Sequence, residues 1–567
     1  MREPAPPGAW THRGDARRSR WGARLRAAAS AVATVLACLL VWFALLAPTE
    51  IGRLGPGAFV RIPLEGLLVV LLVLVLPAGT QRITAVAVGL ALGLLSIVKI
   101  LDMGFLAALG RPFDPVVDWG YVGSAVDLLV DSVGRPAAVV SLVAAGALGV
   151  ALVVLLPLSV LRLTRIVDRH TATSVGAVTA LGMVWAVGAV SGVRIVSDAP
   201  LASTSAAGLV YDHVRRIPDE LRDRQAFAKA SVDDPFRGVR AEELLTGLRG
   251  KDVLVVFVES YGRVAVQDPV FSARVGSTLD AGTSRLRVAG FSSRSAFLTS
   301  PTYGAASWLA HATLQSGLWV DTQQRYDVLV AGDRFTLGDA FKRAGWRTVG
   351  DVPSNREDWP QGEFYDFDTL YDARNVGYVG PEFGYATMPD QYTLAAFHRL
   401  ELAHPHPPVM AEIDLASSHA PWTPLPRLVD WSLVGDGTVF DPMPAQGPST
   451  DVVWRDPERV RTAYGRSIEY TLDALISFVE TYGDPDLVLV VLGDHQPAAI
   501  VSGDAAGHDV PIAVIARDPA VLDRIDGWGW QAGMRPGPDA PVWPMDTFRD
   551  RFLTAYGPRP PSSASGP

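Results

Sequence analysis

The chain has 567 residues, 49% of them hydrophobic, and a formal net charge of −9. Its length predicts two or more structural units, and its positive mean hydropathy of +0.21 is unusual for a wholly soluble protein. The N-terminal residues 1–26 are strongly basic, but the rest is acidic on balance, which argues against nucleic acid as a main partner. The single cysteine, Cys38, lies in an apolar run, so neither a disulfide framework nor a cysteine metal site is expected.

Apolar runs dominate the first 200 residues. A helix needs ~20 residues to cross ~30 Å of hydrocarbon, and each run approaches that length. A cleaved signal peptide would explain one such run but not five in succession. The sequence therefore predicts a five-span membrane domain over residues 27–196. The predicted spans are residues 27–48, 58–77, 82–101, 136–160 and 174–194.

The placement of arginine predicts the orientation of these spans. The basic tail, residues 1–26, and the loop 162–170 both carry the arginines typical of cytoplasmic segments, whereas the acidic loop 102–135 is expected outside. An odd number of spans then places the chain after residue 196 outside the cytoplasm. We therefore expect a multi-pass protein of the cell membrane with an extracytoplasmic C-terminal domain.

Ionisable residues are nearly absent from the predicted spans, which argues against an ion path through the bundle. Lys99 and Asp102 lie near the end of one span and are expected to snorkel toward the interface. Residues 197–250 are a polar linker whose charged stretch HVRRIPDELRDRQAFAKA predicts a surface helix. The tail, residues 556–567, is rich in proline and serine and is expected to be disordered.

Residues 251–555 show short β-branched apolar runs alternating with helical patterns. This alternation predicts an α/β domain with a mainly parallel central sheet flanked by helices. Helices are expected at 336–345 and 458–483. In such sheets, ligands bind outside the carboxyl ends of the strands. The predicted strands are KDVLVVFVES (251–260), 345–352, 408–416, 486–494 and 510–516.

Candidate functional side chains stand where these strands end. Glu259 closes the first strand, Asp494 and His495 close the strand 486–494, and His419 follows the strand 408–416 in the stretch ASSHAPW. A surface turn would explain the glycine and aspartate of GDH, but not a histidine beside the carboxylate at the mouth of a sheet. These residues are therefore the first candidates for a binding site.

A hydroxyl completes the set. Gly304, Ala305 and Ala306 permit a tight turn into a helix that begins near Ser307, at the positive end where anions are favoured. Two carboxylates, one imidazole and one serine oxygen make a mixed oxygen and nitrogen shell for one divalent cation, such as Mn²⁺ or Zn²⁺. A cation of this kind lowers the pKa of a neighbouring hydroxyl and makes it a nucleophile.

The ordered motifs VESYG, a small-residue turn leading to a hydroxyl, HAPW and GDHQP follow the five apolar runs. Together they resemble the sulfatase-like branch of the alkaline phosphatase superfamily, and most closely its membrane-anchored lipoteichoic acid synthase and phosphoglycerol transferase group. The resemblance implies that Glu259, Ser307, Asp494 and His495 hold the metal. It also implies that His419 contacts the phosphoryl group or protonates the leaving alcohol.

The same resemblance implies substrate contacts. Trp359 in REDWPQG matches a groove tryptophan of the family, but the arginine that follows it there is missing, and Arg356 precedes it instead. His508 is a spare histidine that is either a further substrate contact or a structural loop residue. It does not clearly supply the second aspartate and histidine set that two-metal phosphatases need, so a single cation is expected.

The nucleophile is predicted from the family's spacing, in which it stands ten residues before a small residue at the helix end. Gly317 then indicates Ser307, with Thr302 as the alternative nucleophile. Formylglycine sulfatases carry proline and arginine two and four residues after the reacting residue. Leu309 and His311 occupy those positions here, so a true sulfatase is not expected.

The sequence thus predicts a metal-dependent transferase, with Mn²⁺ as the first choice of ion and Zn²⁺ as the alternative. It would move a phosphoryl-linked headgroup, such as phosphoglycerol, from a membrane phospholipid to a glycan or lipid acceptor of the envelope. Two alternatives stay open: a phosphodiesterase or phosphatase with the same chemistry, and a non-catalytic envelope protein with a vestigial site. The sequence predicts no oligomeric state.

Overall fold

The computed structural model describes residues 11–115, 117–191, 194–196, 199–200, 202–203, 205–503 and 506–557. The first ten residues of the predicted basic tail, parts of the predicted linker and residues 558–567 of the predicted tail lie outside these ranges. The chain divides into two compact units. The membrane unit comprises Met1–Leu106, Arg111–Asp114 and Val126–Asp219, and the sheet unit comprises Ala107–Gly110, Pro115–Ala125 and Glu220–Pro567.

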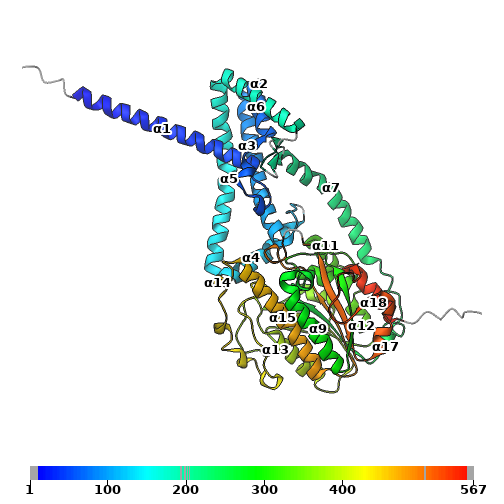
Figure 1. Ribbon diagram of the computed structural model, residues 1–567. Coiled ribbons are helices and arrows are strands. Elements are labelled where there is room, and N and C mark those ends of the chain that lie inside the picture. The colour runs from blue at the N-terminus through cyan, green and yellow to red at the C-terminus, as the bar shows by residue number, and fades with distance from the viewer. Residues whose placement is uncertain are drawn as a thin grey trace, which may run out of the picture. The chain divides into compact units, whose positions relative to one another are not determined.

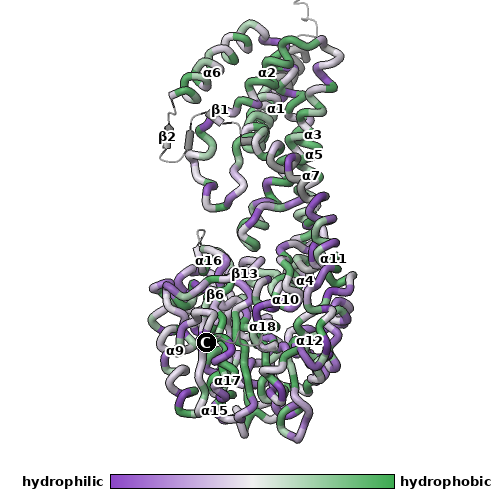
Figure 2. The backbone as a smooth tube through the Cα atoms, turned by 90° about the vertical axis from the view of Figure 1, so that its right-hand side faces the viewer, coloured by the Kyte–Doolittle hydropathy of each residue, from purple (hydrophilic) through white to green (hydrophobic). Residues whose placement is uncertain are grey.

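Long helices make up the N-terminal part of the chain. They are α1 (Thr11–Leu46), α2 (Leu64–Val75), α3 (Ala78–Leu109), α4 (Tyr121–Val133), α5 (Arg135–Arg169), α6 (Thr171–Ser191) and α7 (Ser205–Val232). Figure 2 shows hydrophobic residues along α2 and α6. Within the described residues, four helical stretches are long and apolar enough to cross a membrane. These are Arg24–Leu46, Gly79–Leu109, Arg135–Arg169 and Thr171–Ser191.

The second predicted span is shorter than expected. Of residues 58–77, only Leu64–Val75 form the helix α2, and its 12 residues cover ~18 Å at ~1.5 Å per residue. Proline explains both ends, because Pro63 stands at the N-cap and Leu76, which precedes Pro77, is held in an extended conformation. The five-helix count is therefore not confirmed. The outward placement of residues after 196, which depended on an odd number of spans, stays a prediction.

Lys99 and Asp102 are buried in the membrane unit instead of snorkelling toward an interface. The Nζ of Lys99 donates hydrogen bonds to the carbonyl oxygens of Ala44 (2.9 Å) and Leu45 (3.1 Å), at the C-terminal end of α1. Asp102 accepts a hydrogen bond from the backbone N–H of Phe113 (3.0 Å). The snorkelling prediction was wrong because the last carbonyls of a helix lack partners within the helix and attract a cation.

A mixed nine-stranded sheet forms the centre of the sheet unit, with the order β12-β6-β11-β10-β5-β9-β7-β8 and β13 paired to β6. Its strands are β5 (Asp252–Val258), β6 (Ser292–Thr299), β7 (Arg347–Val352), β8 (Thr369–Asp372), β9 (Val409–Leu415), β10 (Leu487–Gly493), β11 (Asp509–Ala516), β12 (Gln531–Ala532) and β13 (Val542–Pro544). Short strand pairs elsewhere join β1 (Ile62–Pro63) to β4 (Ala202–Ser203) and β2 (Arg194–Val196) to β3 (Ala199–Pro200).

The sheet is parallel only in part. Strands β10, β5, β9, β7 and β8 run parallel to one another. Strand β11 pairs antiparallel with both β10 and β6, and β12 pairs antiparallel with β6. The prediction of a mainly parallel sheet is therefore not confirmed. An apolar run such as VPIAVIA indicates a strand buried on both faces. Such a strand buries the same residues whether it runs parallel or antiparallel to its neighbours, so its composition does not predict its direction.

Helices cover both faces of the sheet. They are α8 (Arg263–Gln267), α9 (Pro269–Val288), α10 (Ser307–Ser316), α11 (Gln323–Val330), α12 (Leu337–Arg343), α13 (Asp390–Phe397), α14 (Thr450–Val453), α15 (Pro457–Tyr482), α16 (Ala499–Ser502), α17 (Pro519–Asp523) and α18 (Phe548–Tyr556). Because strand side chains alternate, β5 sends Leu254 and Val256 into the core with α9 and α15, which lie side by side in Figure 1. It sends Val255 and Phe257 into the opposite core, with α10, α12 and α18.

Candidate metal centre and nucleophile

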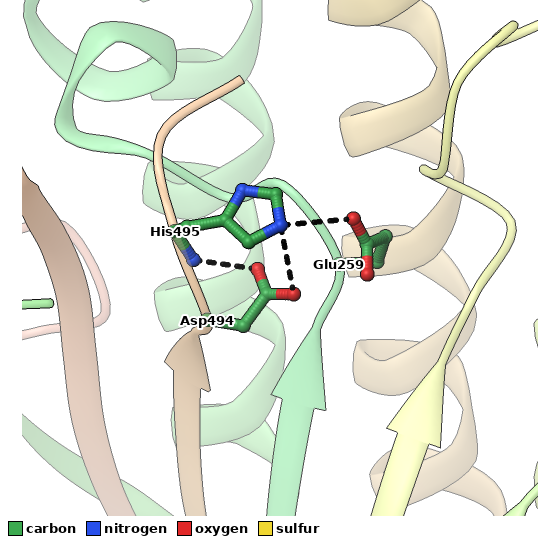
Figure 3. Close-up of side chains that lie close together, drawn as sticks. All are labelled: Glu259, Asp494 and His495. Atoms are coloured by element: carbon green, nitrogen blue, oxygen red, sulfur yellow. Dashed lines mark hydrogen bonds and ion pairs between the residues drawn. The ribbon is translucent and has the colours of Figure 1, made fainter. Parts of the chain in front are cut away.

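Two parallel strands carry three of the predicted ligands to one edge of the sheet. Glu259 follows β5, and Asp494 and His495 follow β10, whose Gly493 pairs with Val258 of β5. His495 Nε2 lies 3.4 Å from Glu259 Oε1 and 3.5 Å from Asp494 Oδ2. Figure 3 shows the three side chains converging beyond the ends of the strands.

Ser307, the first residue of α10, contacts two of these three side chains. Its hydroxyl donates a hydrogen bond to Glu259 Oε2 (3.0 Å) and lies 3.3 Å from His495 Nε2. The preceding turn is tight, with left-handed φ values of 76° at Gly304 and 66° at Ala306. A Cβ at Gly304 would lie 2.2 Å from the carbonyl oxygen of Ala108, so the turn approaches that backbone too closely for any other residue.

Backbone and side-chain donors orient the carboxylates before any ion arrives. The backbone N–H groups of Ser260 and His495 both donate to Asp494 Oδ1 at 2.7 Å. The Ser260 hydroxyl donates to Glu259 Oε1 at 2.8 Å. His495 Nδ1 lies 2.8 Å from the carbonyl oxygen of Gln496 and donates to it, so that once Nε2 is deprotonated its lone pair is free to bind a cation beside the carboxylates.

The charges of this site depend on one another. Burial and the neighbouring charge of Glu259 raise the pKa of Asp494 to about 7. Burial opposes ionisation of Glu259 too, but the positive charges of His419 and His495 outweigh it and lower the pKa of Glu259 to about 2. Burial lowers the pKa of His495, and the charges of Asp494 and Glu259 raise it overall. The two carboxyl groups therefore titrate as a pair that binds a cation most readily once both are ionised.

The donor atoms are spaced as the ligands of a single ion. Bonds of ~2.0–2.2 Å separate neighbouring ligand atoms by about 3.3–3.6 Å in a tetrahedral shell and by about 2.8–3.1 Å in an octahedral one. The contacts among Ser307 Oγ, His495 Nε2 and the two carboxylates run from 3.0 to 3.5 Å. Two carboxylates, one imidazole and one hydroxyl suit Mn²⁺ or Zn²⁺. The residues present therefore fit one divalent cation.

His419 lies beside this donor set, after the end of β9. Its ring stacks on Tyr385 with centroids 3.7 Å apart, and its Nδ1 lies 2.6 Å from the carbonyl oxygen of Ala420. Its charge is close enough to Glu259 to lower the pKa of that carboxyl group. The neutral imidazole thus carries its proton on Nδ1 and presents Nε2 as an acceptor.

The other two hydroxyls of the turn are engaged elsewhere. The Thr302 hydroxyl donates to the carbonyl oxygen of Ala305 (2.6 Å), which closes the turn on itself. The Ser300 hydroxyl donates to the carbonyl oxygen of Asp494 (2.6 Å). Among these three hydroxyls, the one that contacts the predicted ligand side chains is that of Ser307.

Three of the predicted substrate residues have contacts other than the four ligands. Trp359 is half-buried, with its ring 5.4 Å from that of Tyr365. Arg356 is exposed and pairs with Glu382 at 3.2 Å. The His508 ring lies 5.7 Å from the ring of Tyr303. Among the hydrogen bonds and ion pairs of the described residues, none joins these three side chains to the ligands, and their substrate role stays a prediction.

The structure also brings together residues that the sequence interpretation did not select. His311, Glu412 and Asp414 place potential ligand atoms within 4.8 Å of one another. The signal in the sequence is the stretch AEIDLA, in which two acidic residues point to the same face of a buried strand.

Comparisons with known proteins give structural matches alone, since no protein-family profile and no curated protein matches the chain. The lipoteichoic acid synthase LtaP from Listeria monocytogenes is 14% identical over 54% of this chain and 73% of its own, with a TM-score of 0.36. The Streptococcus pyogenes phosphoglycerol transferase GacH is 13% identical over 60% of this chain and 91% of its own, with a TM-score of 0.33.

The match to the integral membrane lipooligosaccharide phosphoethanolamine transferase A from Neisseria meningitidis extends over both units. It covers 91% of this chain and 94% of that protein at 12% identity, with a TM-score of 0.44. A structure described as a member of the alkaline phosphatase superfamily, from Vibrio parahaemolyticus, covers 52% of this chain at 16% identity, with a TM-score of 0.32. The chain is thus similar to solved structures named as transferases or as a member of the alkaline phosphatase superfamily, the group that the sequence motifs resemble.

Proposed function

We propose that this chain is a metal-dependent, membrane-bound transferase. It moves a phosphoryl-linked headgroup from a phospholipid to an acceptor in the cell envelope through a covalent serine intermediate. The observation that carries the proposal is the position of the Ser307 hydroxyl, 3.0 Å from Glu259 and 3.3 Å from His495 at the start of a helix. This position puts the hydroxyl beside two potential metal ligands at once, as a metal-activated nucleophile requires.

Glu259, Ser307, Asp494 and His495 would hold the cation, with Mn²⁺ as the first choice and Zn²⁺ as the alternative. When bound, a divalent ion lowers the pKa of a hydroxyl and neutralises charge on a phosphoryl oxygen. Nucleophilic attack forms a bond between Ser307 Oγ and phosphorus, while the bond from phosphorus to the diacylglycerol oxygen breaks. The Ser307 proton would pass along its hydrogen bond to Glu259 Oε2 and return to the serine when the serine–phosphorus bond breaks. The N-terminus of α10 would present backbone N–H groups to the phosphoryl oxygens.

His419 is the proton carrier of both half-reactions. In the first, its protonated form gives a proton to the departing diacylglycerol oxygen. In the second, the neutral form takes the proton of the acceptor hydroxyl as that oxygen bonds to phosphorus. The bond to Ser307 then breaks, and the serine regains its proton. The stacking of its ring on Tyr385 holds the imidazole in one plane for both transfers.

A cavity of about 610 Å³ in the membrane unit supports a lipid donor. Helices α1, α2, α3, α5 and α7 line it almost entirely with apolar side chains, among them Leu45, Val70, Leu92 and Val160. Ligand cavities have volumes of about 300–1,000 Å³ and are predominantly apolar. An acyl chain of a phospholipid is the occupant that this lining favours.

Mass spectrometry tests the covalent step. Full-length protein in detergent is incubated with mixed phospholipids and Mn²⁺, digested and searched for modified peptides. We expect the peptide with Ser307 to gain the mass of a phosphorylated headgroup, and this mass identifies the headgroup. Thr302→Ala is the matched control and should keep the adduct, whereas Ser307→Ala should lose it. An adduct on Thr302 would instead identify the alternative nucleophile.

Labelled phospholipid separates transfer from hydrolysis. The membrane helices favour transfer, because donor and acceptor both lie at the membrane surface. We expect the label to appear on a glycan or lipid acceptor when envelope extract is supplied. Label that is released only as free headgroup phosphate would identify a hydrolase. Protein that binds the cation but shows neither adduct nor product would be non-catalytic.

A further inference from the structure

A second set of metal-ligating side chains lies one helical turn from the nucleophile. It consists of His311 on α10 and of Glu412 and Asp414 on β9, with potential ligand atoms within 4.8 Å of one another. We propose that these three residues bind a second divalent cation, Zn²⁺ or Mn²⁺, beside the Ser307 site. The existence of this site does not depend on the proposed transferase activity. Only the role that we assign to the second cation rests on that activity.

The fold places the two sets on successive turns of α10. Ser307 contacts Glu259, and the ring of His311 stacks on Phe257, two residues earlier on β5, with centroids 3.8 Å apart. Phe257 pairs in register with Asp414 of β9. Residues four apart on a helix have Cβ atoms about 5–6 Å from each other. The second set therefore lies one turn deeper, under the same helix.

The spacing of the ligand atoms matches that of the first set. His311 Nδ1 lies 2.9 Å from Glu412 Oε1 and 3.5 Å from Asp414 Oδ1. Bonds of ~2.0–2.2 Å separate neighbouring ligands by about 2.8–3.6 Å in octahedral and tetrahedral shells. One imidazole with two carboxylates suits Zn²⁺ and Mn²⁺ among the common divalent ions.

Neighbouring groups hold this set in place. Gln315 Nε2 donates a hydrogen bond to Glu412 Oε2, and Gln315 Oε1 accepts one from the backbone N–H of Gly338 (3.0 Å). The stacking on Phe257 fixes the plane of the His311 ring. Hydrogen bonds and ring contacts made to the ligand side chains orient those side chains toward a metal and belong to the metal site.

One carboxylate oxygen of the set makes no hydrogen bond among the described residues. Asp414 Oδ1 is buried and accepts no hydrogen bond there. A cation at this place would give this buried oxygen a partner besides His311, which lies 3.5 Å from it, and the 29% exposure of the Asp414 side chain leaves a route for the ion.

The balance of charge points to the same conclusion. Glu259, Glu412 and Asp494 all act electrostatically on Asp414, so four carboxyl groups share one small region. One divalent ion at the first set compensates Glu259 and Asp494. Among the described residues, Glu412 and Asp414 both form ion pairs with His311, whose protonated ring carries a single positive charge. A second ion would compensate both carboxylates beside a serine that must meet an anionic phosphodiester. Its role would be to remove this repulsion, since buried charges without compensation are costly.

The test is the number of ions bound per chain. Full-length protein in detergent is stripped with chelator and titrated with Zn²⁺ and, separately, Mn²⁺, with bound metal measured by elemental analysis and calorimetry. We expect two equivalents in the unaltered chain and one in Glu412→Gln. Glu401→Gln is the matched control, because Glu401 is a buried glutamate that pairs with Arg347 (2.7 Å) and belongs to neither set. It should keep two equivalents.

Thermal unfolding identifies variants that fail to fold. Asp414→Asn carries the same test if Glu412→Gln does not fold, because its side chain is partly exposed. A single equivalent in the unaltered chain, or two equivalents in both folded variants, would overturn the proposal and show a hydrogen-bonded ion pair only. Two equivalents without any headgroup adduct would refute the proposed function but would still support the second metal site.

Discussion

Gly304 makes the position of the nucleophile testable without touching the chemistry. A side chain there faces two obstacles: a left-handed φ of 76° and a carbonyl oxygen, that of Ala108, 2.2 Å from the new Cβ. The left-handed conformation costs a residue with a Cβ roughly 1–2 kcal/mol. Relief of the contact requires the turn to move as well, and Ser307 stands three residues further along the same turn.

Gly250 provides the matched control, since its φ is 77° and a Cβ added there would meet nothing within 4 Å. Gly250→Ala and Gly304→Ala should therefore lose similar stability from the backbone conformation. Only Gly304→Ala should also displace Ser307, by roughly 1 Å, and a displacement of that size costs about 10²-fold in rate.

The assay pairs kcat/KM for headgroup transfer with the midpoint of thermal unfolding for both variants. We expect both midpoints to fall and the rate to fall about 100-fold in Gly304→Ala alone. Equal rates in the two variants would refute the reasoning, because the tight approach of this turn would then have no part in positioning the nucleophile.

The remaining predictions concern the ligands, their protons and the membrane. Ser307→Ala should abolish turnover with lipid binding nearly intact, whereas Thr302→Ala should remain active; the reverse result would identify Thr302 as the nucleophile. Asp494→Asn should weaken cation binding, since an amide is a neutral ligand, and a variant with full metal content and turnover would remove Asp494 from the site. The raised pKa of Asp494, about 7, means that the folded chain holds this proton more tightly than the unfolded chain. Without metal, the contribution of Asp494 to stability should therefore fall as the pH rises from about 4 to about 7. Cation affinity should rise over the same range. Thermal unfolding and metal titration between pH 5 and 8 check the two expectations, and a pH-independent affinity would contradict the coupled titration of Asp494 and Glu259. Reporter fusions after residue 250 should be extracytoplasmic, and cytoplasmic fluorescence there would overturn the arginine argument.

The sequence by itself located the strand ends that carry the candidate site. A strand buried on both faces must be apolar throughout, so β5 and β10 stand out as apolar runs, and their ends are marked by the first polar residues, Glu259 and Asp494. The small residues before Ser307 likewise indicated the tight turn, because a backbone that approaches another chain segment so closely excludes larger side chains.

Other features depended on contacts between distant parts of the chain. The antiparallel direction of β11 follows from its neighbours β10 and β6, and an apolar run reads the same in both directions. Lys99 is buried because the end of α1 offers it carbonyl oxygens more than 50 positions earlier in the chain. His311 and Glu412 are about 100 positions apart, and the packing of α10 over β9 brings the imidazole to Glu412 and Asp414. In the sequence, these two acidic residues are seen only as polar residues within an apolar strand. Local composition thus determined where the strands end, and tertiary packing decided which side chains meet there.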